Sequence, residues 1–175
     1  MSPRQIQRSS DNVRAAIDRL LKFQTTGGGL TYWPGRSEVN PYSTSYAGHF
    51  MLEAKRAGFD VPSSFLKPWR KYQQKTARDW KSDSNRKWDH LNQAYRLMVL
   101  ALEGHPEMGA MNRLRRLKDL NPQNKWLLAG AYYLAGQPET GSKLLKGVPT
   151  MLTEYRHLGY TYGSTARDKA LMLYA

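Results

Sequence analysis

The side chains that could do chemistry are few in this chain, and they are scattered along it. A pair of carboxylates could hydrolyse a glycosidic bond, and the acidic candidates are Glu53, Asp60, Asp79, Asp83 and Asp89. Most of these residues fall near the ends of expected helices or in exposed turns, and no Asp-rich motif indicates a diphosphate site. We therefore expect no catalysis by this chain.

Metal and thiol chemistry also lack the residues that they need. The histidines are His49, His90, His105 and His157, and none has the spacing of a metal site such as His-Glu-x-x-His. We expect a structural or surface role for each of them. Cysteine is absent, which rules out a disulfide, a zinc-thiolate site and a Cys nucleophile within the chain. The sequence predicts no cofactor.

A glycine run, Gly27, Gly28 and Gly29, could suggest a phosphate-binding loop. Such a loop needs a Lys and a Ser or Thr at fixed spacing after the glycines, and neither stands there. The residues that follow are aromatic or turn-forming: Tyr32, Trp33, Pro34 and Gly35. We expect a tight turn with the aromatic pair covering the end of a helical hairpin. Stacking on single-stranded nucleic acid is the alternative for such aromatic residues.

Three corners punctuate the chain, and each consists of a glycine followed by a proline. The glycines are Gly58, Gly104 and Gly136, each after an apolar run, with Pro62, Pro106 and Pro138 after them. Glycine closes the last turn of a helix in a left-handed conformation, and proline suits the first turn of the next helix. Repeated corners predict stacked helical hairpins, as in an α-solenoid or an α/α toroid.

Apolar periodicity predicts eight helices, which alternate in character. The expected ranges are 12–24, 43–57, 62–80, 88–103, 107–119, 123–135, 139–146 and 164 onward. The even-numbered helices carry more small residues, such as Ala94 and Gly130, so we place them inside and the odd-numbered ones outside. Pairing consecutive helices gives an all-α fold with about four hairpins, which is a partial α/α toroid.

Two of the inner helices begin alike. Ser43-Thr44 and Ser164-Thr165 each open a helix, each follows a Tyr by one or two residues, and Met-Leu-x-Ala stands at the same offset after both. We interpret Ser43 or Thr44, and Ser164, as the residues at which these helices start.

The composition gives a net charge of +13, with 27 basic and 14 acidic residues. A nucleic-acid partner is one interpretation of this excess. The other is a solvated outer face, because Arg113, Arg115, Arg116 and Lys118 share a helix with an apolar stripe. There is no apolar run near 18 residues, so no membrane span is predicted, and the polar N-terminus has no signal-peptide core.

The order of several segments resembles the thioester-type domain of the alpha-macroglobulin and complement family, in its bacterial branch. The segments are Ala15-Ile-Asp-Arg-Leu-Leu-Lys-Phe-Gln24, Gly27-Gly-Gly-Leu-Thr-Tyr-Trp-Pro-Gly35, Tyr42-Ser-Thr-Ser-Tyr-Ala47, Met51-Leu-Glu-Ala-Lys-Arg-Ala-Gly58, Val61-Pro62, Lys125-Trp-Leu-Leu-Ala-Gly-Ala131 and Tyr162-Gly-Ser-Thr-Ala-Arg-Asp168. They cover most of the chain in the family's order. The thioester motif of the family, Cys-x-x-Gln, has no counterpart here, so no thioester residue carries over.

The resemblance implies an α/α toroid of about six hairpins within a large extracytoplasmic protein, periplasmic or a cell-surface lipoprotein, that traps proteases. Residues 1–175 would be one toroid domain, truncated at both ends relative to its parent, with other parent domains and target proteases as partners. Its function would be that of a non-catalytic part of an endopeptidase inhibitor. Terminal helices without their neighbours would favour self-association.

Two other hypotheses stand beside this one. A basic helical-repeat scaffold would bind nucleic acid or an acidic protein, and would show a steep dependence of affinity on salt. A fragment of a toroidal enzyme would need a pair of catalytic side chains.

Overall fold

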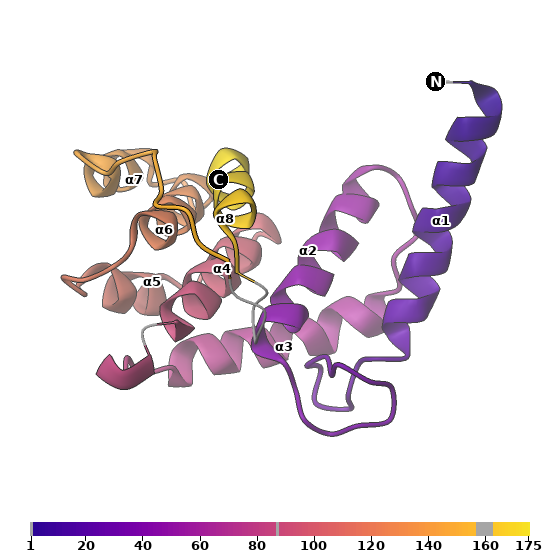
Figure 1. Ribbon diagram of the computed structural model, residues 1–175. Helices are drawn as coiled ribbons and strands as arrows, with labels where there is room; N and C mark the ends of the chain where they lie inside the picture. Colours follow the sequence, from indigo (N-terminus) through magenta and orange to yellow (C-terminus); the bar gives the residue numbers. More distant parts are fainter. Residues whose placement is uncertain (1, 87, 157–162) are drawn as a thin grey trace. The chain divides into compact units, whose positions relative to one another are not determined.

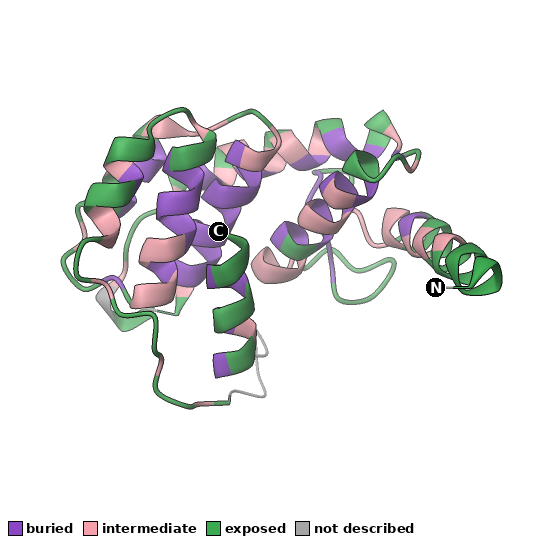
Figure 2. Ribbon diagram, turned by 90° about the horizontal axis from the view of Figure 1, so that it is seen from above, coloured by how far each residue is buried: buried purple, intermediate pink, exposed green. Residues whose placement is uncertain are grey.

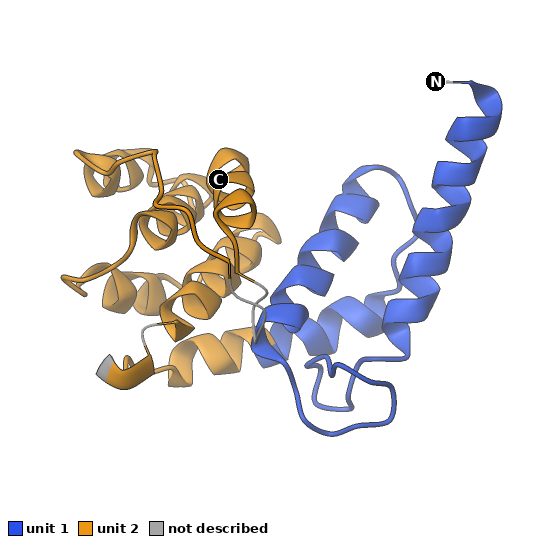
Figure 3. Cartoon of the chain, viewed as in Figure 1, with its two compact units in different colours: residues 1–72 blue, residues 73–175 orange. Residues whose placement is uncertain are grey.

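The computed structural model describes residues 2–86, 88–156 and 163–175, and its chain forms two compact units, residues 1–72 and 73–175 (Figure 3). The helices are α1 (Pro3–Leu21), α2 (Pro41–Arg56), α3 (Ser63–Asp79), α4 (Asp89–Leu102), α5 (Met108–Arg115), α6 (Pro122–Leu134), α7 (Pro138–Leu145) and α8 (Thr165–Tyr174), with a 3-10 turn η1 at Ser84–Arg86 (Figure 1). In the described residues, extended backbone makes only isolated bridges. The predicted all-α fold is confirmed.

The three glycine corners have one geometry. Gly58, Gly104 and Gly136 have φ of 89°, 85° and 74°. The residue after each glycine donates its N–H to a carbonyl five residues back, with N–O distances of 3.0, 2.9 and 2.8 Å. This pattern is the Schellman motif, which satisfies carbonyls at the end of a helix. The corners therefore stop α2, α4 and α6 where the sequence predicts.

Unit 1 has its core between α2 and the first part of α3. Trp69, Phe65 and Met51 are fully buried there. The Trp69 indole lies directly over Gly48, where an added Cβ would come within 2.2 Å of ring carbons. Its Nε1 donates to the Thr44 carbonyl at 2.9 Å. A glycine on α2 thus makes room for the largest buried side chain of the unit.

The first helix is longer than the expected range 12–24. It begins at Pro3, and Ser2 is its N-cap: the Ser2 hydroxyl accepts from the Gln5 N–H at 3.3 Å, and the Gln5 side chain accepts from the Ser2 N–H at 2.8 Å. The expected start at residue 12 was wrong, because the first turns of the helix are polar and carry no apolar stripe. Of α1, only Ile17 is buried, and the rest of the helix is largely exposed (Figure 2).

Unit 2 is built around α4 and α6, which pack against each other and carry most of its buried residues (Figure 2). Helix α6 also contacts α5, α7 and α8. Small residues allow the close approaches: an added Cβ at Gly130 would lie 3.0 Å from the Ala175 carbonyl oxygen, and one at Gly141 would lie 2.9 Å from the Ala129 carbonyl oxygen. The expected crowding of the even-numbered helices is therefore observed in this unit.

A helix pairing and the end of α5 also differ from the expectation. We paired the seventh helix with the eighth, but α7 has α6 as its principal neighbour, because Gly141 lets it lie on the α6 backbone. Helix α5 stops at Arg115, four residues before the expected end at Asp119.

Candidate functional site

The glycine run in unit 1 is a close contact between backbones. Gly28 has φ of 94°, and an added Cβ would lie 2.1 Å from the Pro68 carbonyl oxygen. At Gly29 an added Cβ would meet Val39 at 2.6 Å and Tyr72 at 3.0 Å. Gly27 has room by comparison. The run therefore lets the loop lie flat on α3, as a tight turn requires, and nothing about it suggests a phosphate site.

The aromatic pair after this run does not cover the hairpin. Trp33 is 70% exposed and Tyr32 is 41% exposed, whereas Leu30 and Thr31 are buried in their place. The expectation of packing was wrong for this pair. The loop turns outward after Thr31, whose hydroxyl donates to the Trp33 carbonyl at 2.7 Å, and Gly35 completes the turn with φ of 77°. Pro34 lies in the same exposed turn.

The start of α2 holds this loop in place through one hydroxyl. Thr44 is fully buried, and its Oγ1 accepts from the Leu30 N–H at 2.9 Å and donates to the Asn40 carbonyl at 2.8 Å. The N-cap is Asn40, whose side chain accepts from the Ser43 N–H at 2.8 Å. Ser43 and Thr44 are thus inside the first turn, and the predicted start was two or three residues late because Pro41 opens the helix.

The start of α8 repeats this arrangement. Ser164 is the N-cap, as predicted, and its hydroxyl accepts from the Arg167 N–H at 3.1 Å. Thr165 is buried, and its Oγ1 accepts from the Tyr155 N–H at 2.8 Å and donates to the Thr153 carbonyl at 3.2 Å. The shared Ser-Thr therefore marks a threonine that anchors the incoming segment to the first turn of a helix.

A buried charge stands beside this second anchor. Asp168 is fully buried, accepts a hydrogen bond from the Tyr155 hydroxyl, and pairs with Arg167, whose Nε lies 2.9 Å from the carboxylate. Burial, followed by the hydrogen bond to Asp168, raises the pKa of Tyr155 to about 12. Sequence reasoning missed this cluster, because Tyr155 and Asp168 are 13 residues apart and no periodicity links them.

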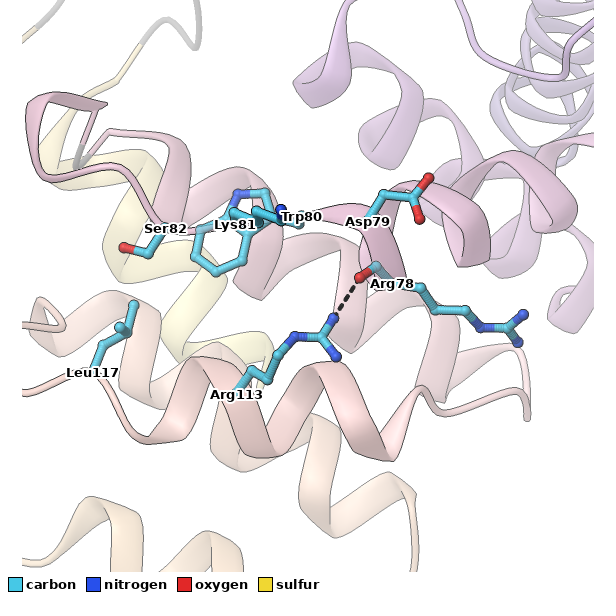
Figure 4. Close-up of a pocket in the computed structure, with 7 residues that line it drawn as sticks. All are labelled: Arg78, Asp79, Trp80, Lys81, Ser82, Arg113 and Leu117. Carbon is cyan, nitrogen blue, oxygen red and sulfur yellow. Dashed lines mark hydrogen bonds between the residues drawn. The ribbon is translucent and has the colours of Figure 1, made fainter.

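Two of the hollows on unit 2 lie at the ends of helices. The first, of about 750 Å³, lies where α3 ends, and Figure 4 shows Arg113 reaching across it to the Arg78 carbonyl at 2.7 Å. Several of its polar groups are engaged by protein neighbours: Arg78 binds Glu107 through two hydrogen bonds, and the Trp80 Nε1 donates to Asp89 at 2.7 Å. This hollow is therefore a site of structural contacts that tie α3 to α5 and α4.

The second hollow, of about 620 Å³, lies at the starts of three helices. Its walls are Trp88 and Leu91 at the start of α4, residues 121–124 at the start of α6, Gly163 and Arg167 at the start of α8, and parts of the segment 149–155. Asn124 is 1% exposed, and its Oδ1 has no hydrogen-bond partner. The sequence offers no signal for this residue, because asparagine at the third position of a helix looks like ordinary first-turn polarity.

Four of the five acidic candidates bind a neighbouring side chain, and each has a different partner. Glu53 pairs with Arg56 at 3.2 Å, Asp79 with Lys75 at 2.6 Å, and Asp83 with Arg86 at 2.9 Å. Asp89 accepts from Trp80 as described, and Asp60 is exposed. These contacts are those of helix ends and surface pairs.

The histidines are also in structural surroundings. His90 Nε2 lies 3.0 Å from the Ser82 hydroxyl, His105 lies 2.8 Å from Glu103, and burial lowers the pKa of His49. His157 lies outside the described residues. Within the described ranges no group of three or more His, Cys, Asp or Glu side chains could hold a metal ion.

Comparison with known proteins gives relatives of one kind. No family model matches the chain. It is 28% identical over 182 residues to an alpha-2-macroglobulin of Xylella fastidiosa (strain Temecula1), which covers 93% of this chain and 10% of that protein. The chain therefore spans about a tenth of the length of the curated relatives that it matches.

Solved structures agree on the fold. The crystal structure of native Escherichia coli alpha-2-macroglobulin from domain MG7 to the C-terminus matches with a TM-score of 0.81 at 22% identity, over 95% of this chain and 28% of that one. Trypsin-activated alpha-2-macroglobulin from E. coli matches with a TM-score of 0.75 at 23% identity, over 90% of this chain and 11% of that one. The predicted helical fold of the α/α-toroid type is confirmed, and the homologues of this chain are bacterial alpha-2-macroglobulins.

Proposed function

We propose that this chain is a non-catalytic helical segment of an alpha-2-macroglobulin-like protein that traps proteases. The observation that carries the proposal is the match to bacterial alpha-2-macroglobulins along 93% of the chain. The described carboxylates and histidines support a non-catalytic role, since they serve helix ends, surface pairs and packing. The helices would act by protein contact and by a change of conformation in the parent.

In this proposal residues 1–175 are part of one toroid-type domain that contacts other domains of a longer parent chain outside the cytoplasm. No helix in the described part of the chain is both long enough and apolar enough to cross a membrane. The chain has no cysteine, so any thioester of the parent would be formed by residues outside it. Self-association through the terminal helices stays a prediction. Ile17 and Leu171 are covered within the chain, whereas Leu173 is 90% exposed.

The test is protease trapping by the complete product of the gene that encodes this chain. After incubation with trypsin, a trapped protease should keep its activity on a small chromogenic peptide and become protected from a large protein inhibitor. The trapping protein should also change its mobility on a native gel. Trypsin inactivated beforehand at its active site is the control and should produce no shift.

Degradation of the gene product without protection of trypsin would contradict the proposal. The basic-scaffold alternative is not favoured by the relatives. It predicts instead that the chain binds nucleic acid or an acidic protein, with an affinity for nucleic acid that falls steeply with salt.

A further inference from the structure

The second hollow of unit 2 has the features of a binding site. It is formed by the first residues of α4, α6 and α8, so partial positive charge from three helix starts faces it. Helix starts alone do not make a site, because solvent or capping groups satisfy most of them. A second feature, a buried polar side chain in the wall of the hollow, has an oxygen atom without a hydrogen-bond donor.

That feature is the side chain of Asn124. It is 1% exposed and lines the hollow, and its Oδ1 makes no hydrogen bond. A buried polar group without a partner destabilises the folded protein. Native proteins satisfy nearly all such groups. A ligand that donates a hydrogen bond to Asn124 would remove this cost when it binds.

The other walls narrow the chemistry of that ligand. Two further side-chain amide groups, Asn121 and Gln123, stand beside Asn124, and Trp88, Pro149 and Met151 provide apolar surface. Trp88 is 50% exposed and Met151 is 86% exposed. A carboxamide both donates and accepts, so it matches the N–H and C=O of a peptide group. The apolar surface suits a side chain next to that peptide group.

A simple anion fits the hollow less well. Arg167 is the cation on its wall, and this guanidinium is held by the buried Asp168 and by the Tyr155 hydroxyl. Its charge is thus already balanced by a carboxylate. The unsatisfied atom in the wall is an acceptor, Asn124 Oδ1, and an acceptor needs a donor.

We propose that this hollow binds an extended peptide segment of another protein, with an apolar side chain flanked by acidic residues. The peptide group would donate its N–H to Asn124, and its apolar side chain would lie against Trp88 and Pro149. Acidic flanks follow from charge complementarity, because the whole chain carries a net charge of +13. The inference does not depend on protease trapping.

The test is to titrate the 175-residue chain with the blocked peptide acetyl-Glu-Leu-Glu-methylamide and to measure the heat of binding by calorimetry. We expect saturable binding that weakens when lysine replaces both glutamates. A set of analogues in which an ester replaces one backbone amide at a time removes single N–H donors. One analogue should bind roughly tenfold more weakly, which is the loss of one hydrogen bond to a buried acceptor.

Asn124→Leu provides the matching change in the protein. It should weaken peptide binding by roughly tenfold without lowering the melting temperature, because it removes an unsatisfied polar group from a buried position. Asn92→Leu is the control: Asn92 is also buried with an unsatisfied Oδ1, but it does not line the hollow, so affinity should stay the same among molecules that fold.

Several outcomes would overturn the proposal. They are no binding at millimolar peptide, equal affinity of all ester analogues, or unchanged affinity of Asn124→Leu. If Asn124→Leu does not fold, the ester analogues decide the question with the unaltered protein. A dimer that Asn124→Leu disrupts would identify a second copy as the occupant. Tighter binding of a peptide from the chain's own gene product than of any acidic peptide would identify the parent chain.

Discussion

In the first turns of both α2 and α8, a threonine hydroxyl binds the backbone of the segment that precedes the helix. Thr44 and Thr165 each sit in the first turn of a helix, and each hydroxyl accepts an N–H from the preceding segment and donates to a carbonyl of that segment. Each threonine hydroxyl therefore satisfies one backbone N–H and one backbone carbonyl in the residues that precede it. The Ser-Thr pair opens α8, whereas in α2 it follows the N-cap Asn40 and lies inside the first turn.

The surroundings of the two anchors differ. Around Thr44 the space is filled by apolar and backbone contacts: Trp69 lies on Gly48, and Gly28 lies against the Pro68 carbonyl. Beside Thr165 a buried carboxylate, Asp168, organises Tyr155 and Arg167, and an unfilled hollow remains. The space around Thr44 is therefore filled by side chains and backbone, whereas the polar cluster beside Thr165 borders a hollow that contains an unsatisfied polar atom, Asn124 Oδ1.

The largest effect should come from removing the charge that only the second anchor has. Asp168→Ala leaves Arg167 beside Tyr155 without its carboxylate, in a place where the Arg167 side chain is 15% exposed. Breaking a buried pair in this way costs about 3–5 kcal/mol of unfolding free energy. Urea denaturation measures it.

The control for that change is Asp79→Ala. Asp79 pairs with Lys75 on the surface, with side chains 62% and 81% exposed, so its loss should leave the unfolding free energy nearly unchanged. Similar costs for the two variants would show that the Asp168 cluster contributes no more than a surface pair.

In the loop of the first anchor the sensitive position should be Gly28. Gly28→Ala adds a Cβ that would lie 2.1 Å from the Pro68 carbonyl oxygen, at φ of 94°. Overpacking together with the left-handed backbone should lower the unfolding free energy by about 3 kcal/mol. Thermal or urea denaturation checks this.

Gly35→Ala separates the two causes. Gly35 also has positive φ, of 77°, but an added Cβ meets nothing within 4 Å. Gly35→Ala should therefore lower the unfolding free energy only by the cost of the left-handed backbone conformation, about 1–2 kcal/mol. If Gly28→Ala costs no more than Gly35→Ala, the loop can lift from α3 and the contact is not needed.

Removing either threonine hydroxyl should lower the unfolding free energy by a similar amount, which is smaller than the losses for Asp168→Ala and Gly28→Ala. Thr44→Val and Thr165→Val keep the shape of the side chain and leave backbone groups without partners. Each should cost about 1–3 kcal/mol. A cost at Thr44 with none at Thr165, measured by denaturation of each variant, would show that the two anchors are alike in sequence but not in energy.

The fold was largely readable from the sequence, and the polar cluster was not. Glycine corners and apolar periodicity act locally, so Gly58, Gly104 and Gly136 marked the helix ends correctly. The cluster of Tyr155 and Asp168 depends on how a segment without periodicity returns to α8. The early start of α1 was missed for a related reason, since its polar first turns bury nothing that a pattern could reveal.

The pH dependence offers a finer view of the second anchor. Tyr155 has its pKa raised from 10.0 to about 12 in the folded chain, by burial and then by its bond to Asp168. The folded state therefore holds this proton more tightly than the unfolded state. The stabilisation is complete below pH 10 and is lost as the pH rises toward 12.

Tyr155→Phe should remove the part of the alkaline loss of stability that Tyr155 causes. The comparison with the unaltered protein separates this part from the contributions of the other tyrosines. The measurement is the unfolding free energy of both proteins at several pH values from neutral to 12. Parallel curves for the two proteins would mean that Tyr155 titrates alike in the folded and unfolded states.

The smallest effect should come from the residue that sequence reasoning placed against the hairpin. Trp33 is 70% exposed, and the turn around it is held by Thr31 and Gly35, not by the indole. Trp33→Ala should therefore change the unfolding free energy by about 0.5 kcal/mol or less. Trp69→Ala, in the dry core of the same unit, should cost about 3–5 kcal/mol in the same denaturation experiment. A large loss for Trp33→Ala would mean that this side chain is covered in solution, and the distinction between a closed first anchor and an exposed aromatic loop beside it would fail.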